Sequence, residues 1–274
     1  MNELITYLKK CEKQVGMGIK KLRKTFTPEL LHLLRVEIKK IRFIADVIAF
    51  KYPESVINEI IKPFNRIFKA AGKIRDSHIE AYLLENYSMP EIAGGLKEIL
   101  LDKQKRDKSL SFFISGKDKR NMDRSFRMLA LYLKTMSRMD AEAYLKAMNE
   151  MVEQYVLKDT LSPFEMHEMR KVLKKIDCAE ILLEINFSST RIINASLYDL
   201  LGKWHDHIII IDRLKHSMEA GFEGQEEVRF YEEIISDISV RNEKYLHEIY
   251  AKIDQLRMLN GLNNSNKTEN THLN

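Results

Sequence analysis

Two stretches of the chain place histidine, arginine and lysine at the spacing of a helix. The first, residues 32–42, is HLLRVEIKKIR, and the second, residues 167–177, is HEMRKVLKKID. Each begins four residues after a proline, and both share the pattern H-x-x-R-x-x-x-K-K-I. Guanidinium, ammonium and protonated imidazole groups are the side chains that bind phosphate oxygens. The pattern therefore indicates an anion-binding surface in each stretch.

A helix would gather these cations on one face. At about 100° per residue, four basic positions of the first stretch fall within an arc of about 80°, and three matching positions of the second stretch lie on the same arc. The first stripe consists of His32, Arg35, Lys39 and Arg42, and the second stripe consists of His167, Arg170 and Lys174. Like charges at this spacing repel one another. An anion lying along each stripe would remove that repulsion, whereas the alternative for a single stripe is a solvated helix face.

A second motif follows each stripe. Residues 72–76 are GKIRD and residues 202–206 are GKWHD, which share the pattern G-K-x-x-D. Two motifs that recur in the same order predict two homologous halves. We place the first half at 1–138 and the second at 139–260, and we expect residues 261–274, which have few apolar side chains, to be disordered.

The motifs supply a set of candidate binding residues. The expected anion-binding residues are His32, Arg35, Lys39, Lys40, Arg42, Lys73, His167, Arg170, Lys174, Lys175 and Lys203. Gly72 and Gly202 are expected to permit a helix end or a close helix approach, because glycine has no side chain. Asp76 and Asp206 are expected to cap the helices that follow them. The joint recurrence of both motifs favours a function over two solvated faces.

The composition predicts an all-α protein. The chain has 274 residues with only 5 Pro and 10 Gly, and its apolar residues recur with helical periodicity. Helices are expected at about 2–23, 28–51, 54–75, 77–87, 91–114, 119–138, 140–157, 163–186, 189–202, 206–220 and 225–258. Thr27 and Ser162 directly precede prolines that can begin a helix, so both are predicted N-caps.

Charge and cysteine content narrow the class of function. The formal charge of +5 comes from 45 basic and 40 acidic residues, so the clustering of cations, and not the net charge, suggests a polyanion partner. Two cysteines are too few for a disulfide framework or a zinc site. The N-terminal residues do not resemble a secretory signal, and no apolar run approaches the roughly 20 residues of a membrane span. These features predict a soluble, cytoplasmic protein.

With both motifs in both halves, the chain resembles CHAD proteins, the conserved histidine α-helical domain family, over roughly residues 2–258. The resemblance implies two pseudo-symmetric helical bundles around a basic central channel that binds inorganic polyphosphate, often on polyphosphate granules. The Arg-Asp pair of the family's second motif is present at residues 75–76, and its Asn-Asp counterpart is residues 205–206, His-Asp. Asp177 stands where the family commonly has Arg, so we expect a weaker second stripe.

The expected activity is binding without catalysis, with no cofactor and no metal. Nucleic acid is the first alternative partner for the same stripes, although nucleic-acid-binding proteins often add exposed aromatic rings, which the stripes lack. The second alternative is a metal-dependent HD-type phosphohydrolase built on His205 and Asp206. His167 and Asp212 would then supply further ligands. Polyphosphate binding is expected to weaken with salt and, through His32 and His167, to tighten as the pH falls.

Overall fold

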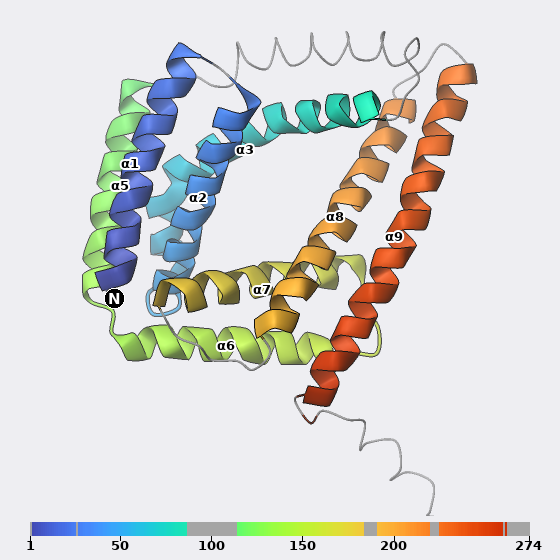
Figure 1. The fold of residues 1–274 in the computed structure, drawn as a ribbon. Coiled ribbons are helices and arrows are strands. Elements are labelled where there is room, and N and C mark those ends of the chain that lie inside the picture. The colour runs from blue at the N-terminus through green and yellow to red at the C-terminus, as the bar shows by residue number, and fades with distance from the viewer. Residues whose placement is uncertain are drawn as a thin grey trace, which may run out of the picture. The chain divides into compact units, whose positions relative to one another are not determined.

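The structure is a computed structural model that describes residues 2–25, 27–86, 114–183, 191–219, 225–259 and 261. All regular structure in these ranges is α-helical, which confirms the predicted fold class (Figure 1). The helices are α1 (Asn2–Lys24), α2 (Pro28–Ala49), α3 (Glu54–Asn86), α5 (Gly116–Lys134), α6 (Arg138–Val156), α7 (Pro163–Leu183), α8 (Arg191–Glu219) and α9 (Gln225–Leu259). None of these described helices is long and apolar enough to cross a membrane. The helix expected at 91–114, up to residue 113, and the predicted tail beyond Gly261 lie outside the described residues.

The chain divides into two compact units. Unit 1 is Met1–Tyr144 and unit 2 is Leu145–Asn274. The division falls inside α6, whereas the sequence repeat places it after residue 138. Each unit contains one of the two stripes, the first on α2 and the second on α7.

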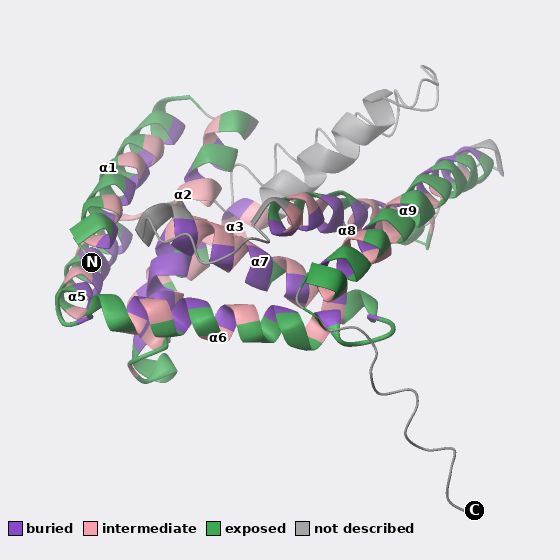
Figure 2. Cartoon of the chain, turned by 60° about the horizontal axis from the view of Figure 1, so that its bottom comes forward, coloured by how far each residue is buried: buried purple, intermediate pink, exposed green. Residues whose placement is uncertain are grey.

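Apolar seams between neighbouring helices hold unit 1 together. The buried residues of α1 recur every three or four residues and so form one side of the helix, and Figure 2 colours them purple. Helix α2 packs against both α1 and α3, and α5 packs against α1 and α3. Leu34, Ile38 and Ile41 of α2 are each at most 1% exposed. Because these residues alternate with the stripe cations, their burial fixes which face of α2 carries the positive charge.

In unit 2 the stripe helix α7 also buries one apolar face. Helix α8 packs against both α7 and α9. Met169, Leu173 and Ile176 of α7 are at most 2% exposed. They occupy the same positions relative to the second stripe as the buried residues of α2 occupy relative to the first. The cations of each stripe are therefore placed by the same apolar pattern.

The two stripe helices begin at the predicted N-caps. The Thr27 hydroxyl accepts a 3.2 Å hydrogen bond from the backbone N–H of Leu30. The Ser162 hydroxyl accepts a 3.3 Å hydrogen bond from the N–H of Glu165, whose carboxylate accepts a 2.7 Å bond from the N–H of Ser162. Such caps satisfy backbone donors that the first helical turn leaves unpaired. They place each stripe histidine one turn into its helix.

Two predicted helix breaks are wrong. The expected helices at 54–75 and 77–87 are the single helix α3, and those at 189–202 and 206–220 are the single helix α8. Asp76 and Asp206 therefore lie inside helices and cap neither of them. The buried residues of α8 continue on both sides of Gly202, with Leu201 fully buried and Trp204 only 4% exposed. Burial along this seam outweighs the cost of about 1 kcal/mol for a glycine inside a helix.

The cap of α7 should make the free energy of unfolding decrease at acidic pH. Hydrogen bonds from Lys158 Nζ and from Ser162 lower the pKa of Glu165 from 4.5 to about 2. Since its pKa is lower in the folded state, Glu165 contributes its full stabilisation above about pH 4.5 and loses it as the pH falls toward about 2. We expect Glu165→Gln to unfold at a lower urea concentration than the wild type near neutral pH, by circular dichroism, with little difference near about pH 2.

Glu153→Gln is the matched control for this variant, because Glu153 is an exposed carboxylate on the neighbouring helix α6. It should leave the unfolding midpoint almost unchanged at both pH values. A Glu165→Gln variant whose destabilisation is the same at both pH values would contradict the role of the ionised cap.

Candidate anion-binding site

Arg35 is held on α2 by an aromatic ring of α3. Its guanidinium carbon lies 4.1 Å from the ring centroid of Phe68, and its Nη1 donates a 2.7 Å hydrogen bond to the Phe68 carbonyl oxygen. Two turns further along α2, the guanidinium carbon of Arg42 lies 4.9 Å from the centroid of the same ring. The negative face of an aromatic ring attracts cations. Phe68 therefore holds two cations of the first stripe close together without neutralising either of them.

Gly72 gives the guanidinium of Arg35 its space. It lies one helical turn after Phe68 on α3, and a Cβ atom at this position would lie 2.8 Å from Arg35 Nη1. That distance is too short for a non-bonded contact, so any side chain here would displace the guanidinium. The two sequence motifs of the first half thus meet in space, because the glycine of one makes room for the arginine of the other.

Unit 2 contains the same three-residue contact. The guanidinium carbon of Arg170 lies 5.4 Å from the ring centroid of Tyr198, a residue of α8. Gly202 follows Tyr198 by one turn, and a Cβ atom there would lie 3.4 Å from Arg170 Nε and 3.5 Å from its Nη2. The expected close approach at both glycines is therefore an approach of a guanidinium and not of a helix backbone. The fit is looser than at Gly72.

The remaining stripe residues are at least partly accessible on their helices. His32 is exposed and Lys39 half-buried on α2, and Lys174 is half-buried on α7. His32 and Lys39 both take part in interactions within the structure. Each stripe therefore combines an arginine fixed by the neighbouring helix with further cations along the same face.

Lys40 lies away from the first stripe. Its Nζ forms a 2.7 Å ion pair with Glu37 and lies 5.8 Å from the ring centroid of Tyr7 on α1. Lys40 therefore faces α1, whereas Arg35 faces α3. Lys175, the corresponding residue of α7, is half-buried and has an interaction of its own.

The two lysines of the second motif are not brought to the stripes by any described contact. Lys73 lies in α3, but its side chain is outside the described residues. Lys203 is exposed on α8, with its Nζ 5.9 Å from the ring centroid of Tyr245 on α9. Lys203 therefore faces α9, although the adjacent Gly202 faces Arg170.

A pair of histidines lies beside Arg170. The ring centroids of His167 on α7 and His205 on α8 are 4.3 Å apart, with an interplanar angle of 40°. Burial lowers the pKa of both imidazoles below 6.5, and for His205 the proximity of His167 and then Arg170 lowers it further. His167 Nδ1 and Arg170 Nε are buried and have no hydrogen-bond partner. The geometry thus favours neutral imidazoles beside a fixed cation.

Part of the alternative metal-ligand set is brought together. Of the four residues considered, His167 and His205 are adjacent, and Asp206 and Asp212 are exposed on α8. Within the described ranges, no three His, Cys, Asp or Glu side chains gather closely enough to hold a metal ion.

Sequence reasoning missed the two rings that orient the arginines. Phe68 and Tyr198 each stand four residues before the glycine of the second motif, so an aromatic-x-x-x-Gly pattern was present in both halves. The stripes themselves contain no aromatic residue, as expected, but the adjacent helix supplies one under each arginine. His205, a candidate metal ligand in the phosphohydrolase alternative, lies next to His167 and is therefore also a candidate binding residue.

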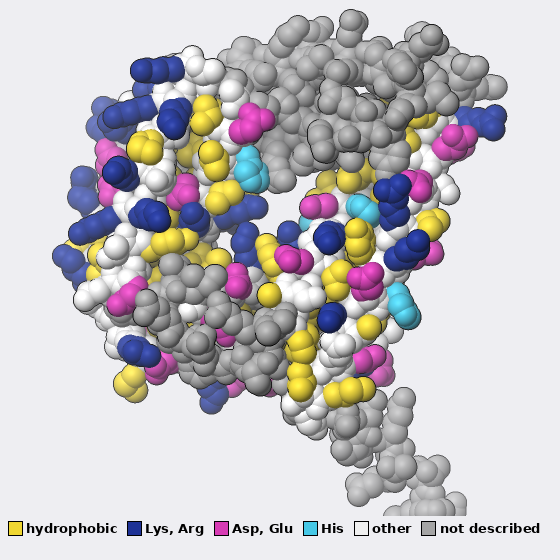
Figure 3. Space-filling view, viewed as in Figure 1, with side chains coloured by type: hydrophobic (Ala, Val, Ile, Leu, Met, Phe, Trp, Pro, Cys, Tyr) yellow, Lys and Arg dark blue, Asp and Glu magenta, His cyan; other side chains and the backbone are white. Residues whose placement is uncertain are grey.

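Unit 1 carries a second basic surface, on α1 and α5. Lys and Arg outnumber Asp and Glu by seven to two in α1 and by six to two in α5, and the two helices pack together. In Figure 3 dark-blue side chains crowd the unit that contains these helices. Arg120 and Arg124, both exposed on α5, belong to this surface and not to the first stripe. They provide a control for any effect of positive charge alone.

Gly72→Ala should displace the guanidinium of Arg35 while leaving the fold intact. The new methyl group would collide with the end of a flexible side chain, and alanine favours a helix over glycine by about 1 kcal/mol. The Arg35 Hε resonance, which the Phe68 ring shifts in the wild type, should move toward its random-coil position in the NMR spectrum.

Gly202→Ala is the matched control, because its methyl group would make only an ordinary contact with Arg170. The Arg170 resonance should change little in that variant. An Arg35 signal that is unchanged in Gly72→Ala would show that the glycine does not control the arginine.

Comparison with family models and curated proteins identifies no relative of this chain. A scan of protein-family models finds no model that matches the chain, and a search of curated proteins finds no match. The likeness to CHAD proteins therefore rests on the two sequence motifs.

Proposed function

We propose that the protein binds inorganic polyphosphate through the two stripes without hydrolysing it. The observation that carries this proposal is the repeated contact of an arginine with an aromatic ring and a glycine, made by Arg35 in unit 1 and by Arg170 in unit 2. A side chain held in this way has already lost much of its rotational freedom. It binds an anion with a smaller entropic cost than a mobile surface arginine would.

The orientation of each guanidinium suits phosphate oxygens. An aromatic ring covers one face of the group, so that an anion approaches in its plane, where the N–H donors point. Along α2, the stripe from His32 to Arg42 extends about 15 Å, at 1.5 Å per residue. A ligand that uses the whole stripe must be an extended polyanion and not a single phosphate group.

The aromatic residues favour a ligand without bases. Phe68 and Tyr198 are each covered by an arginine guanidinium, and neither is a bare platform on which a nucleobase could stack. Polyphosphate has no bases to stack, and it gains its affinity from charge neutralisation, counterion release and hydrogen bonds to its oxygens. The resemblance to CHAD proteins supports the same ligand and a basic channel around it. In this proposal the protein is cytoplasmic and associates with polyphosphate granules.

Replacing Arg35 and Lys39 together with Ala should reduce polyphosphate affinity roughly a hundredfold, since each charge-assisted contact contributes about 1.5 kcal/mol or more. Fluorescence anisotropy with a size-defined, labelled polyphosphate measures this loss. The logarithm of affinity should also fall less steeply with the logarithm of salt concentration than in the wild type. Arg170→Ala with Lys174→Ala should cause a smaller loss, because Asp177 lies on the same helix.

Arg120→Ala with Arg124→Ala is the charge-matched control, because it removes two cations from unit 1 outside the stripe. It should retain most of the affinity. Equal losses in the two double variants would mean that positive charge alone binds the ligand and would refute the assignment of the stripe. Tighter binding of single-stranded RNA than of polyphosphate would instead favour the nucleic-acid alternative.

Binding should need no metal and should produce no phosphate. We expect unchanged polyphosphate affinity in the presence of a chelator, since the stripes supply positive charge without an ion. Incubation with polyphosphate, triphosphate or ATP and Mg²⁺ or Mn²⁺ should release no orthophosphate in a colorimetric assay. Metal-dependent release that is lost on changing His205 or Asp206 would favour the phosphohydrolase.

A further inference from the structure

The second motif differs between the two halves at one position that matters for charge. The third residue after the glycine is Arg75 in the first half and His205 in the second. Arginine is always protonated, whereas histidine changes its charge near neutral pH. In unit 2 this histidine lies against His167, with 4.3 Å between their ring centroids, and both lie beside Arg170.

We propose that His205 forms, with His167 and Arg170, a phosphoryl-binding subsite of unit 2 that takes up a proton when polyphosphate fills it. This inference rests on the proposed function and adds a binding residue and a proton to it. The subsite lies where α7 crosses α8, at the position that Gly202 leaves open for Arg170. Its ligand is a phosphoryl group of the chain.

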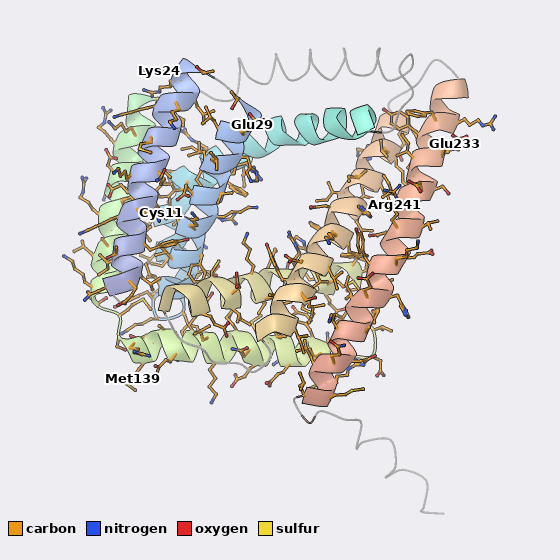
Figure 4. All side chains as sticks on the ribbon, in the orientation of Figure 1. Cys11, Lys24, Glu29, Met139, Glu233 and Arg241 are labelled. Carbon is orange, nitrogen blue, oxygen red and sulfur yellow. The ribbon has the colours of Figure 1, made fainter. Side chains whose placement is uncertain are left out.

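The free subsite disfavours added positive charge. The charged side chains that act on the pair among the described residues are Arg170, Lys171 and Glu168 of α7 and Asp206 of α8. Two of these are cations, and from α9 a third cation, Arg241, acts on the neighbouring His207 (Figure 4). Burial, together with Arg170 and Lys171, lowers the pKa of both imidazoles and so favours their neutral form near pH 7.

A bound phosphoryl group reverses this balance. Its negative charge beside the pair stabilises the imidazolium form and offsets the repulsion from Arg170. The two rings titrate as one coupled unit, because a proton on one disfavours a proton on the other at this distance. His167 Nδ1 is buried without a hydrogen-bond partner, so a proton added there would have no acceptor. Neither ring nitrogen of His205 is both buried and without a partner. The added proton therefore resides mainly on His205.

Calorimetric titration in buffers of different ionisation enthalpy measures the number of protons taken up on binding. With one long, size-defined polyphosphate near pH 7, the wild type should take up about one proton per filled subsite, and affinity should rise by up to about tenfold per pH unit as the pH falls. His205→Gln should lose most of this uptake and bind more weakly near pH 6 than the wild type does. His205→Arg should keep the affinity and lose the uptake, because its charge is permanent.

His216→Gln is the matched control, since His216 lies later on the same helix with its side chain 86% exposed. Terminal phosphoryl groups of the ligand also titrate near neutral pH, and comparing variants on one ligand sample cancels that contribution. Wild-type proton uptake in His205→Gln would overturn the inference and leave the proposed function standing. A wild type that binds no polyphosphate at low salt would overturn both.

Discussion

The contact on which the candidate site depends is an arginine guanidinium held over an aromatic ring and against a glycine of the next helix. Arg35 with Phe68 and Gly72, and the corresponding residues of unit 2, each join the two sequence motifs of one half. The contact forms only if the two helices keep one register. The apolar seam between them supplies that register, because Leu34 and Ile38 are buried on the same helix that presents the cations.

The ring also offsets the repulsion between two cations of the first stripe. Cations arranged in a row repel one another, and neutralising them with carboxylates would remove the charge that a polyanion needs. An aromatic face attracts a cation but leaves its charge intact. Phe68 serves Arg35 and Arg42 at once, so one apolar side chain on α3 holds two like charges in place. Lys40 forms an ion pair with Glu37 and lies toward α1.

The two units use the same framework with different chemistry. The arginine of the stripe fits tightly against Gly72 in unit 1 and more loosely against Gly202 in unit 2. The second motif contains Arg75 in unit 1, whereas in unit 2 it contains His205, which lies beside His167. Arginine is always protonated, whereas histidine changes its charge near neutral pH, so the second motifs of the two units differ in how their charge responds to pH. Asp177 stands in the second stretch at the position that Arg42 has in the first, and it reduces the positive charge there.

The sequence alone determined the all-α class, the N-caps Thr27 and Ser162 and the cationic stripes, because caps and helical faces depend on residues within one or two turns. It failed at Gly72 and Gly202, where local propensity suggested helix ends but burial along the helix seam kept α3 and α8 continuous. Which ring lies under each arginine, and that His205 meets His167, was decided only by tertiary structure. These contacts join residues about thirty or more positions apart, and only the packing of whole helices brings such residues together.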